Sequence, residues 1–277
     1  MKNSKRVNEL IIEISEQYFI VEGQITDLIT RETLENMNEK SQPKIGAIAI
    51  GSAILGQIGT ATIANLAVSD EGIDVSIFAL ELTDIHGDKH YLKGCFPEVI
   101  FKNGDQVKVI VQPLNQSYAL AKAVIDIKNN YIWTGQEVVR GRMQYRLWAI
   151  KLIVYCLIVT FIFLIILDFF MSGRTHFTLF SDIGIVITSV IIILIFLVIG
   201  WKVGSSFDEQ SIELEAILLK LGFNKPTMAN LYNFSVFNVK NKNKEEITGY
   251  STRWADYTYR IDLAQQADKE KYGKSAK

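Results

Sequence analysis

The chain has 277 residues, 49% of them hydrophobic, and a formal net charge of −1. This length allows about one or two domains, and the near-neutral charge argues against a nucleic-acid-binding protein held by phosphate contacts. The two cysteines, Cys95 and Cys156, lie far apart and lack the spacing of a metal site, so we expect neither a disulfide nor a bound metal.

Residues 1–44 predict an N-terminal helix followed by a first strand over residues 18–29. Glu9 and Glu13 interrupt what would have to be the apolar core of a signal peptide. We therefore expect no cleaved secretion signal.

Residues 45–68 form a Gly/Ala-rich apolar insert that is long enough to span a membrane. Four small residues recur at every fourth position, a spacing that lets helices approach closely: Ser52, Gly56, Thr60 and Ala64. Lysines precede the insert and acids follow it, and a simple span would place the next domain outside the cell. Two interpretations stay open: a helical hairpin or amphipathic helix that packs on the protein or dips into the lipid interface, and a true or conditional span.

Residues 69–139 predict a β domain. Val107, Val109 and Val111 share one face of a strand and Lys108 lies on the other. His86 and His90 flank Gly87-Asp88, which indicates a hairpin turn rather than a metal pair. Together with the first strand, the segments that follow predict a small OB-like or SH3-like barrel. These segments are 74–82, 91–96, 106–111 and 118–127.

Residues 147–203 predict a transmembrane hairpin with spans at 147–171 and 183–203. The second span contains 19 residues without a charge, Ile183 to Trp201, which as a helix would be about 28 Å long and match the hydrocarbon core. Neither span shows the polar stripe of a buried core helix. The short connection, 172–182, requires the two spans to be antiparallel neighbours.

Cation bias sets the expected orientation. The connection contains one cationic residue, Arg174, whereas five cationic residues flank the other ends of the spans: Arg140, Arg142, Arg146, Lys151 and Lys202. Trp148 and Trp201 fall on the same border, where indole rings are favoured. We therefore expect a multi-pass protein of the bacterial inner membrane with both termini in the cytoplasm.

Residues 204–277 predict a small cytoplasmic α/β region. Ser206 and Glu209 match a capping box, and Gly222 is placed to end the helix that follows. The apolar face of that helix consists of Leu214, Ile217, Leu218 and Leu221. Two further segments, 234–239 and 257–261, are predicted to pair as strands.

No pattern of catalytic, cofactor-binding or metal-binding residues is present in the sequence, so the chain is expected not to be an enzyme. The expected partners are the lipid bilayer and another protein.

Several stretches carry a resemblance to a known family. They are Val21-Glu22-Gly23-Gln24-Ile25, Ile45 to Val68, Arg140-Gly141-Arg142, Leu221-Gly222-Phe223-Asn224-Lys225-Pro226 and Tyr257-Thr258-Tyr259-Arg260. In these stretches and in the order of its parts, the chain resembles bacterial inner-membrane proteins labelled type VI secretion system effectors. The resemblance implies a role in a secretion-linked effector–immunity pair and brings no catalytic residues.

Two hypotheses follow. In the first, the protein acts by contact: as an effector that inserts residues 45–68 and the hairpin into a rival's membrane, or as an immunity protein that blocks such a toxin. In the second, it is a housekeeping membrane scaffold whose β domain recruits a cytoplasmic partner, since small barrels serve many binding roles.

Overall fold

The computed structural model describes residues 2–35, 73–113, 119–135, 138–172, 183–243 and 252–273. The insert at 45–68, with Ser52, Gly56, Thr60 and Ala64, lies outside these residues, as does most of the connection between the predicted spans. The chain divides into two compact units. One combines residues 1–141 with 209–277, and the other is residues 142–208.

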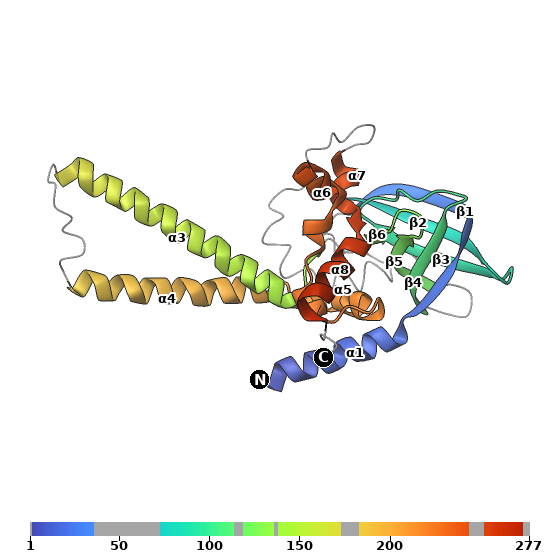
Figure 1. Cartoon of the computed structure of the whole chain (residues 1–277), viewed down its shortest axis with the longest axis horizontal. Coiled ribbons are helices and arrows are strands. Elements are labelled where there is room, and N and C mark those ends of the chain that lie inside the picture. Colours follow the sequence, from blue (N-terminus) through green and yellow to red (C-terminus); the bar gives the residue numbers. More distant parts are fainter. Residues whose placement is uncertain are drawn as a thin grey trace. The chain divides into compact units, whose positions relative to one another are not determined.

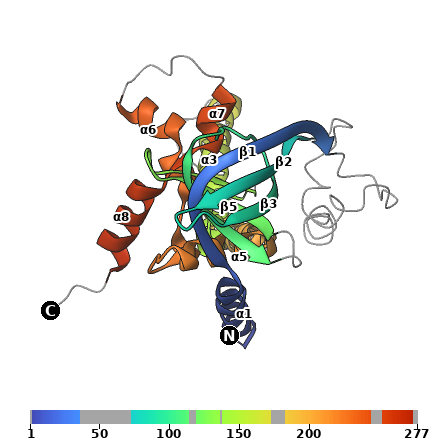
Figure 2. The same ribbon diagram turned by 90° about the vertical axis from the view of Figure 1, so that its right-hand side faces the viewer.

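Five strands of the first unit form a closed β-barrel, which confirms the predicted barrel (Figure 2). Its first strand, β1, pairs antiparallel with β2 and with β4, and a parallel pair between β3 and β5 closes the barrel. The strands are β1 (Phe19–Glu35), β2 (Ile73–Asp84), β3 (Lys89–Phe96), β4 (Gln106–Pro113) and β5 (Ala119–Asp126).

Two further strands extend the sheet beyond β5. They are β6 (Tyr131–Thr134) and the two-residue β7 (Tyr259–Arg260). The strand order is β3-β2-β1-β4-β5-β6-β7. A sheet whose first strand in the sequence lies near the N-terminus is therefore completed by a strand from near the C-terminus.

The barrel strands bury side chains on both faces, which gives this unit two cores. Val107, Val109 and Val111 point into the barrel, as their alternation predicts, where they join an aromatic cluster of Phe78, Phe96, Phe101 and Trp133. Phe78 meets Phe96 edge to face, with ring centroids 4.9 Å apart. Outside the barrel, Ile110, Ile125 and Ile132 pack against helices of the C-terminal region.

The C-terminal region is mostly helical and covers that outer core (Figure 1). Its elements are α5 (Asp208–Lys220), η1 (Pro226–Met228), η2 (Leu231–Phe234), α6 (Val236–Asn243), α7 (Thr252–Tyr257) and α8 (Ile261–Tyr272). The N-terminal helix α1 (Lys2–Gln17) contributes the side chain of Ile11 to the same outer core.

Gly222 ends α5 as predicted. Its φ of 85° is a left-handed conformation that glycine adopts without strain. The Phe223 N–H donates to the Leu218 carbonyl (3.1 Å) and the Gly222 N–H to the Leu219 carbonyl (3.0 Å), the two bonds of a Schellman motif. Phe223 is thereby directed into the outer core.

Two sequence predictions are wrong in this region. Residues 234–239 do not form a strand, because the Ser235 hydroxyl accepts a hydrogen bond from the Asn238 N–H (3.2 Å) and caps α6 instead. Only an isolated bridge from Ser235 to Tyr259 remains of the predicted pair. The capping box is also not formed, because the Ser206 hydroxyl donates to the Val203 carbonyl (2.6 Å) and α5 begins at Asp208.

The second unit holds two long helices, α3 (Arg142–Ser172) and α4 (Ile183–Ser205). Their bounds contain the two predicted spans, 147–171 and 183–203, completely.

Candidate membrane hairpin and its polar base

The two helices of the second unit expose apolar side chains along most of their described length. Tyr155 and Val159 on α3 are each 66% exposed, and Leu194 and Val198 on α4 are 57% and 60% exposed. Among the described residues, α3 is long and apolar enough by composition to cross a membrane over Arg142–Phe163. Large exposed apolar surfaces on a protein mark a contact with lipid or with another protein.

α3 and α4 approach each other most closely at one end (Figure 1), where two glycines of α4 face α3. A Cβ atom on Gly204 would overlap the Arg146 Cα and lie 3.0 Å from the Arg146 nitrogen. A Cβ atom on Gly200 would lie 2.8 Å from the Ile153 Cδ1 atom. Gly200 and Gly204 form a GxxxG pattern, which allows helix backbones to come close in lipid.

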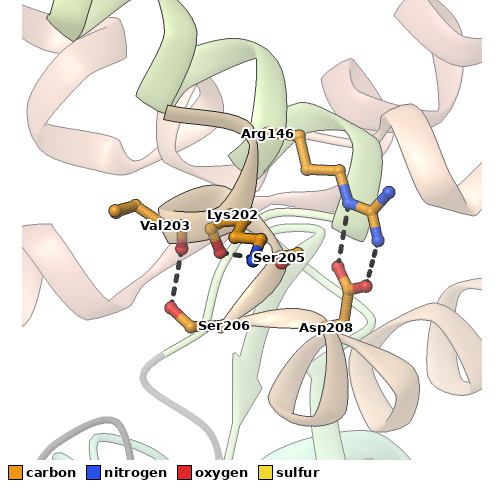
Figure 3. Close-up of polar contacts among 6 residues, drawn as sticks. All are labelled: Arg146, Lys202, Val203, Ser205, Ser206 and Asp208. Carbon is orange, nitrogen blue, oxygen red and sulfur yellow. Dashed lines mark hydrogen bonds and ion pairs between the residues drawn. The ribbon is translucent and has the colours of Figure 1, made fainter. Parts of the chain in front are cut away.

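Where α3 and α4 come close, an ion pair joins the first and the last part of residues 142–208 (Figure 3). The guanidinium of Arg146 binds the Asp208 carboxylate through two atoms, with its Nε 3.3 Å from Asp208 Oδ1. The guanidinium also lies over the ring of Trp201, 4.8 Å from the ring centroid. These three residues, Arg146, Trp201 and Asp208, are called the polar base below.

Aromatic and hydroxyl contacts complete this end of the hairpin. Tyr145 stacks on Phe207 with ring centroids 4.6 Å apart. The Ser205 hydroxyl donates to the Lys202 carbonyl (2.7 Å), as Ser206 does to Val203 (Figure 3). The carbonyls of Lys202 and Val203 also accept the Ser206 N–H (3.2 Å each), so the two hydroxyls add second bonds at the end of α4.

The structure brings together two of the predicted topology anchors, Arg146 and Trp201. Trp148, Lys151 and Lys202 are exposed on the same two helices. Arg142 is buried at the start of α3. Arg140 belongs to the first unit, where its Nε donates to Asn230 Oδ1 (3.3 Å) and its guanidinium lies over Tyr232.

Sequence reasoning missed the glycine pair and Asp208. The GxxxG spacing at 200–204 was visible in the sequence, at the end of an apolar run. Asp208 had no local signal, because its partner lies 62 positions earlier in the chain.

A second polar cluster holds the loop after α5, one of the stretches that carry the family resemblance. The buried carboxylate of Asp268 on α8 accepts hydrogen bonds from the Asn224 N–H (2.6 Å), the Asn224 Nδ2 (2.9 Å) and the Lys225 N–H (3.1 Å). The Gln265 side chain donates to the Leu221 carbonyl (3.0 Å). These contacts fasten α8 to the loop and need no ligand.

The histidine pair lies at the predicted β2–β3 turn. Asp84 accepts hydrogen bonds from the His86 and Asp88 N–H groups (2.8 and 2.9 Å), and the His90 Nε2 lies 3.2 Å from its other oxygen. The bond from His90 holds the pKa of Asp84 below its usual value, and the backbone N–H groups contribute. Within the described residues no group of three or more His, Cys, Asp or Glu side chains is arranged to hold a metal ion.

Comparison with protein-family models, with curated proteins and with solved structures found no match for this chain.

Proposed function

We propose that this chain is a two-span protein of the bacterial inner membrane. In this proposal α3 and α4 are embedded in lipid side by side. The observation that carries the proposal is the apolar surface of both helices, which is exposed at most of the described positions outside the contact between them. In water such a surface would be strongly unfavourable, at about 25 cal/mol for each Å² of apolar area. In lipid it needs no cover, and close packing at glycines holds such helices together.

The polar base supports an orientation in which this end of the hairpin faces the cytoplasm. Arg146 and Trp201 lie where a span leaves the hydrocarbon, which is the depth that indole rings and cationic side chains favour. Lys151 and Lys202 add positive charge to the same helix ends. Both termini of the chain are then cytoplasmic.

We further propose that the barrel is OB-like and acts by binding a protein, without catalysis. The parallel closure between β3 and β5 supports an OB-like barrel over an SH3-like one. Following the family resemblance, we assign the chain to a type VI secretion effector–immunity system. The exposed apolar side chains of α3 and α4 favour the resident immunity role, because an exported effector has to keep such side chains covered until it reaches its target.

Reporter fusions test the topology. Alkaline phosphatase, which is active only outside the cytoplasm, is fused to the chain either after residue 177 or after residue 277. A fluorescent protein is fused separately at each of the same two positions. We expect phosphatase activity only from the fusion after residue 177 and fluorescence only from the fusion after residue 277. Ends on opposite faces of the membrane, or a chain that stays in solution without detergent, would overturn the proposal.

Growth measurements separate the two roles in competition. The chain is expressed in a sensitive host with and without a periplasmic targeting signal, alone and with toxins encoded by neighbouring genes. An immunity protein protects from one co-expressed toxin and does not arrest growth by itself, whereas an effector arrests growth when it is targeted to the periplasm. If the chain neither protects from a toxin nor arrests growth, the effector–immunity assignment is rejected and the membrane scaffold remains.

A further inference from the structure

Within the described residues, strand β1 pairs with two strands over its first part and with only one over the rest. Residues Phe19–Gln24 pair with β4 on one side of β1, and Gly23–Glu35 pair with β2 on the other. The pairing with β4 ends where the Ile25 N–H and carbonyl bond to Asp105 and Gly104. From Asp27 to Glu35, no strand in the described part of the chain pairs with the edge of β1 that faces away from β2 (Figure 2).

The free edge presents an alternating set of side chains. Leu28 packs against the barrel core, so its neighbours Asp27 and Ile29 point outward, and Arg31 follows on the outward side. All three outward side chains are exposed, Ile29 by 65%. Neither Asp27 nor Arg31 has an ion pair or a side-chain hydrogen bond within the described residues.

We propose that this edge pairs with the same edge of a second copy of the chain, antiparallel and around a two-fold axis at Ile29. In that register Asp27 of each copy lies opposite Arg31 of the other, on the same face of the joined sheet. Ile29 of each copy lies directly opposite its equivalent. Backbone N–H and C=O groups of both edges, which no described strand pairs with, bond to each other across the axis.

The charges select both the partner and the register. A symmetric antiparallel pair places residues i and j opposite each other when i + j is a constant even number. Centring the pair on Ile29 creates two opposite-charge pairs at once, whereas centring it on Arg31 places the two guanidinium groups against each other. A strand that carries its own complement, Asp-x-Ile-x-Arg, is suited to a second copy of itself.

Cysteine cross-linking tests the register in the full-length protein in detergent. Cys95 and Cys156 are first replaced by serine, and Ile29→Cys is then introduced. Residues directly opposite in an antiparallel pair have Cα atoms about 4.5–5.5 Å apart, which is within the range of a disulfide. We expect a covalent dimer from Ile29→Cys under mild oxidation. Ile85→Cys, at an 89% exposed turn position, is the matched control and should remain mostly monomeric.

Charge exchange tests the attraction that the proposal invokes. Asp27→Arg places two cations opposite each other twice in the dimer, and Arg31→Asp does the same with two anions. Because each cross-strand pair changes from attraction to repulsion, each single variant should raise the dimer dissociation constant by about tenfold. The double variant Asp27→Arg/Arg31→Asp restores opposite charges and should return the constant close to its original value. The measurement is sedimentation equilibrium in a density-matched detergent.

Three outcomes would overturn the proposal. The first is a chain that stays monomeric at all concentrations. The second is an Ile29→Cys variant that cross-links no better than Ile85→Cys, which would indicate random collision. The third is a dimer that the charge exchange leaves unchanged, which would place the interface elsewhere. Circular dichroism and a cooperative thermal transition in each variant exclude a simple failure to fold.

Discussion

Gly204 is a point of close approach between the helices of the second unit, where a single added methyl group would meet backbone atoms of Arg146. The Arg146 Cα cannot move aside without separating α3 from α4. At Gly200, one turn earlier, the atom in the way is the Cδ1 of Ile153, the end of a flexible side chain. The two glycines therefore differ in what a substitution costs, although they belong to one pattern.

The prediction is that Gly204→Ala destabilises the hairpin by about 1–3 kcal/mol, the usual range for forcing extra volume into a packed contact. Gly200→Ala is the matched control and should cost clearly less, because Ile153 can rotate. Unfolding of the purified protein by increasing sodium dodecyl sulfate, followed by circular dichroism, measures both. Equal effects at the two positions would contradict the packing described at Gly204.

Tyr18 gives the first unit an expected sensitivity to alkali. Tyr18 follows α1 in the chain and its side chain is buried in the outer core. Burial raises its pKa well above the usual value, and the nearby Glu213 carboxylate adds to the effect. The folded protein therefore keeps Tyr18 neutral at a pH where the unfolded chain, with a tyrosine pKa of about 10, has ionised. The contribution of Tyr18 to the free energy of unfolding is therefore fully present below pH ~10 and decreases as the pH rises above it.

We predict that the free energy of unfolding falls above pH ~10 by up to about 1.4 kcal/mol per pH unit from Tyr18 alone. Tyr18→Phe should reduce that slope, while Tyr232→Phe, at an exposed position, should leave it unchanged. Urea unfolding between pH 8 and pH 11.5 measures the slope. Identical slopes in all three proteins would show that Tyr18 ionises in the folded state as readily as in the unfolded chain.

Single residues were predictable where their effect is local. Gly222 was predicted from its position after an apolar helix face, and its left-handed φ explains why. Asp268 was not predicted, since its three donors lie 43 and 44 positions earlier in the chain. Ser206 was assigned to the wrong helix, because a hydroxyl near the junction of two helices can serve either one.

Among the elements, α3 is the one in which a single substitution best distinguishes an apolar helix in water from one in lipid. Val159 lies near the middle of α3 and is 66% exposed. On a soluble helix, a lysine at such an exposed position would change stability by only about 0.5 kcal/mol. At the centre of a membrane span it would cost about 2.5–3.5 kcal/mol.

We therefore predict that Val159→Lys greatly reduces the fraction of the chain that stays in membranes after carbonate extraction. Leu147→Lys, closer to the end of the helix, is the control and should have little effect, because its ammonium group can reach the headgroups. Immunoblotting of the membrane and soluble fractions gives the measurement. Full retention of the Val159→Lys protein would argue that α3 does not cross the lipid.

Element types were predictable from periodicity and turn signals, whereas their ends were not. The strands predicted over 74–82, 91–96, 106–111 and 118–127 all exist, with ends shifted by a few residues. The strand predicted over 18–29 continues to Glu35, because β2 provides a partner for its whole second half. Of residues 234–239, the part from Val236 onward belongs to α6 instead of a strand, since the Ser235 cap outweighs the apolar and β-branched residues around it.

At the scale of the whole molecule, the second unit is an insertion within the first. The C-terminal segment returns to the barrel through the pair of β6 with β7 and through a hydrogen bond from Trp133 Nε1 to Thr258 Oγ1 (3.0 Å). These contacts join residues more than 120 positions apart. No local pattern could have predicted them, although the sequence did place a polar region on each side of the hairpin.

We predict that the first unit folds without the second. Replacing residues 142–208 with a flexible linker of about ten Gly and Ser residues should give a protein that is soluble without detergent and unfolds in one cooperative transition. Trp133→Phe in this shortened chain should lower its stability, because the hydrogen bond to Thr258 is lost. Aggregation of the shortened chain at every linker length tested would show that the first unit depends on the hairpin.

The outer core of the first unit has a consequence for how the protein is made. During translation the ribosome completes β4, β5 and β6 before the hairpin, so Ile110, Ile125 and Ile132 emerge before Leu214, Ile217 and Leu218, which cover them. In the proposed membrane topology, the nascent chain would therefore deliver both apolar helices to the insertion machinery while one side of its barrel is still uncovered. In that topology, a delay in insertion would leave the uncovered apolar face of the barrel exposed to chaperones and proteases, so the survival of the whole chain would depend on successful insertion.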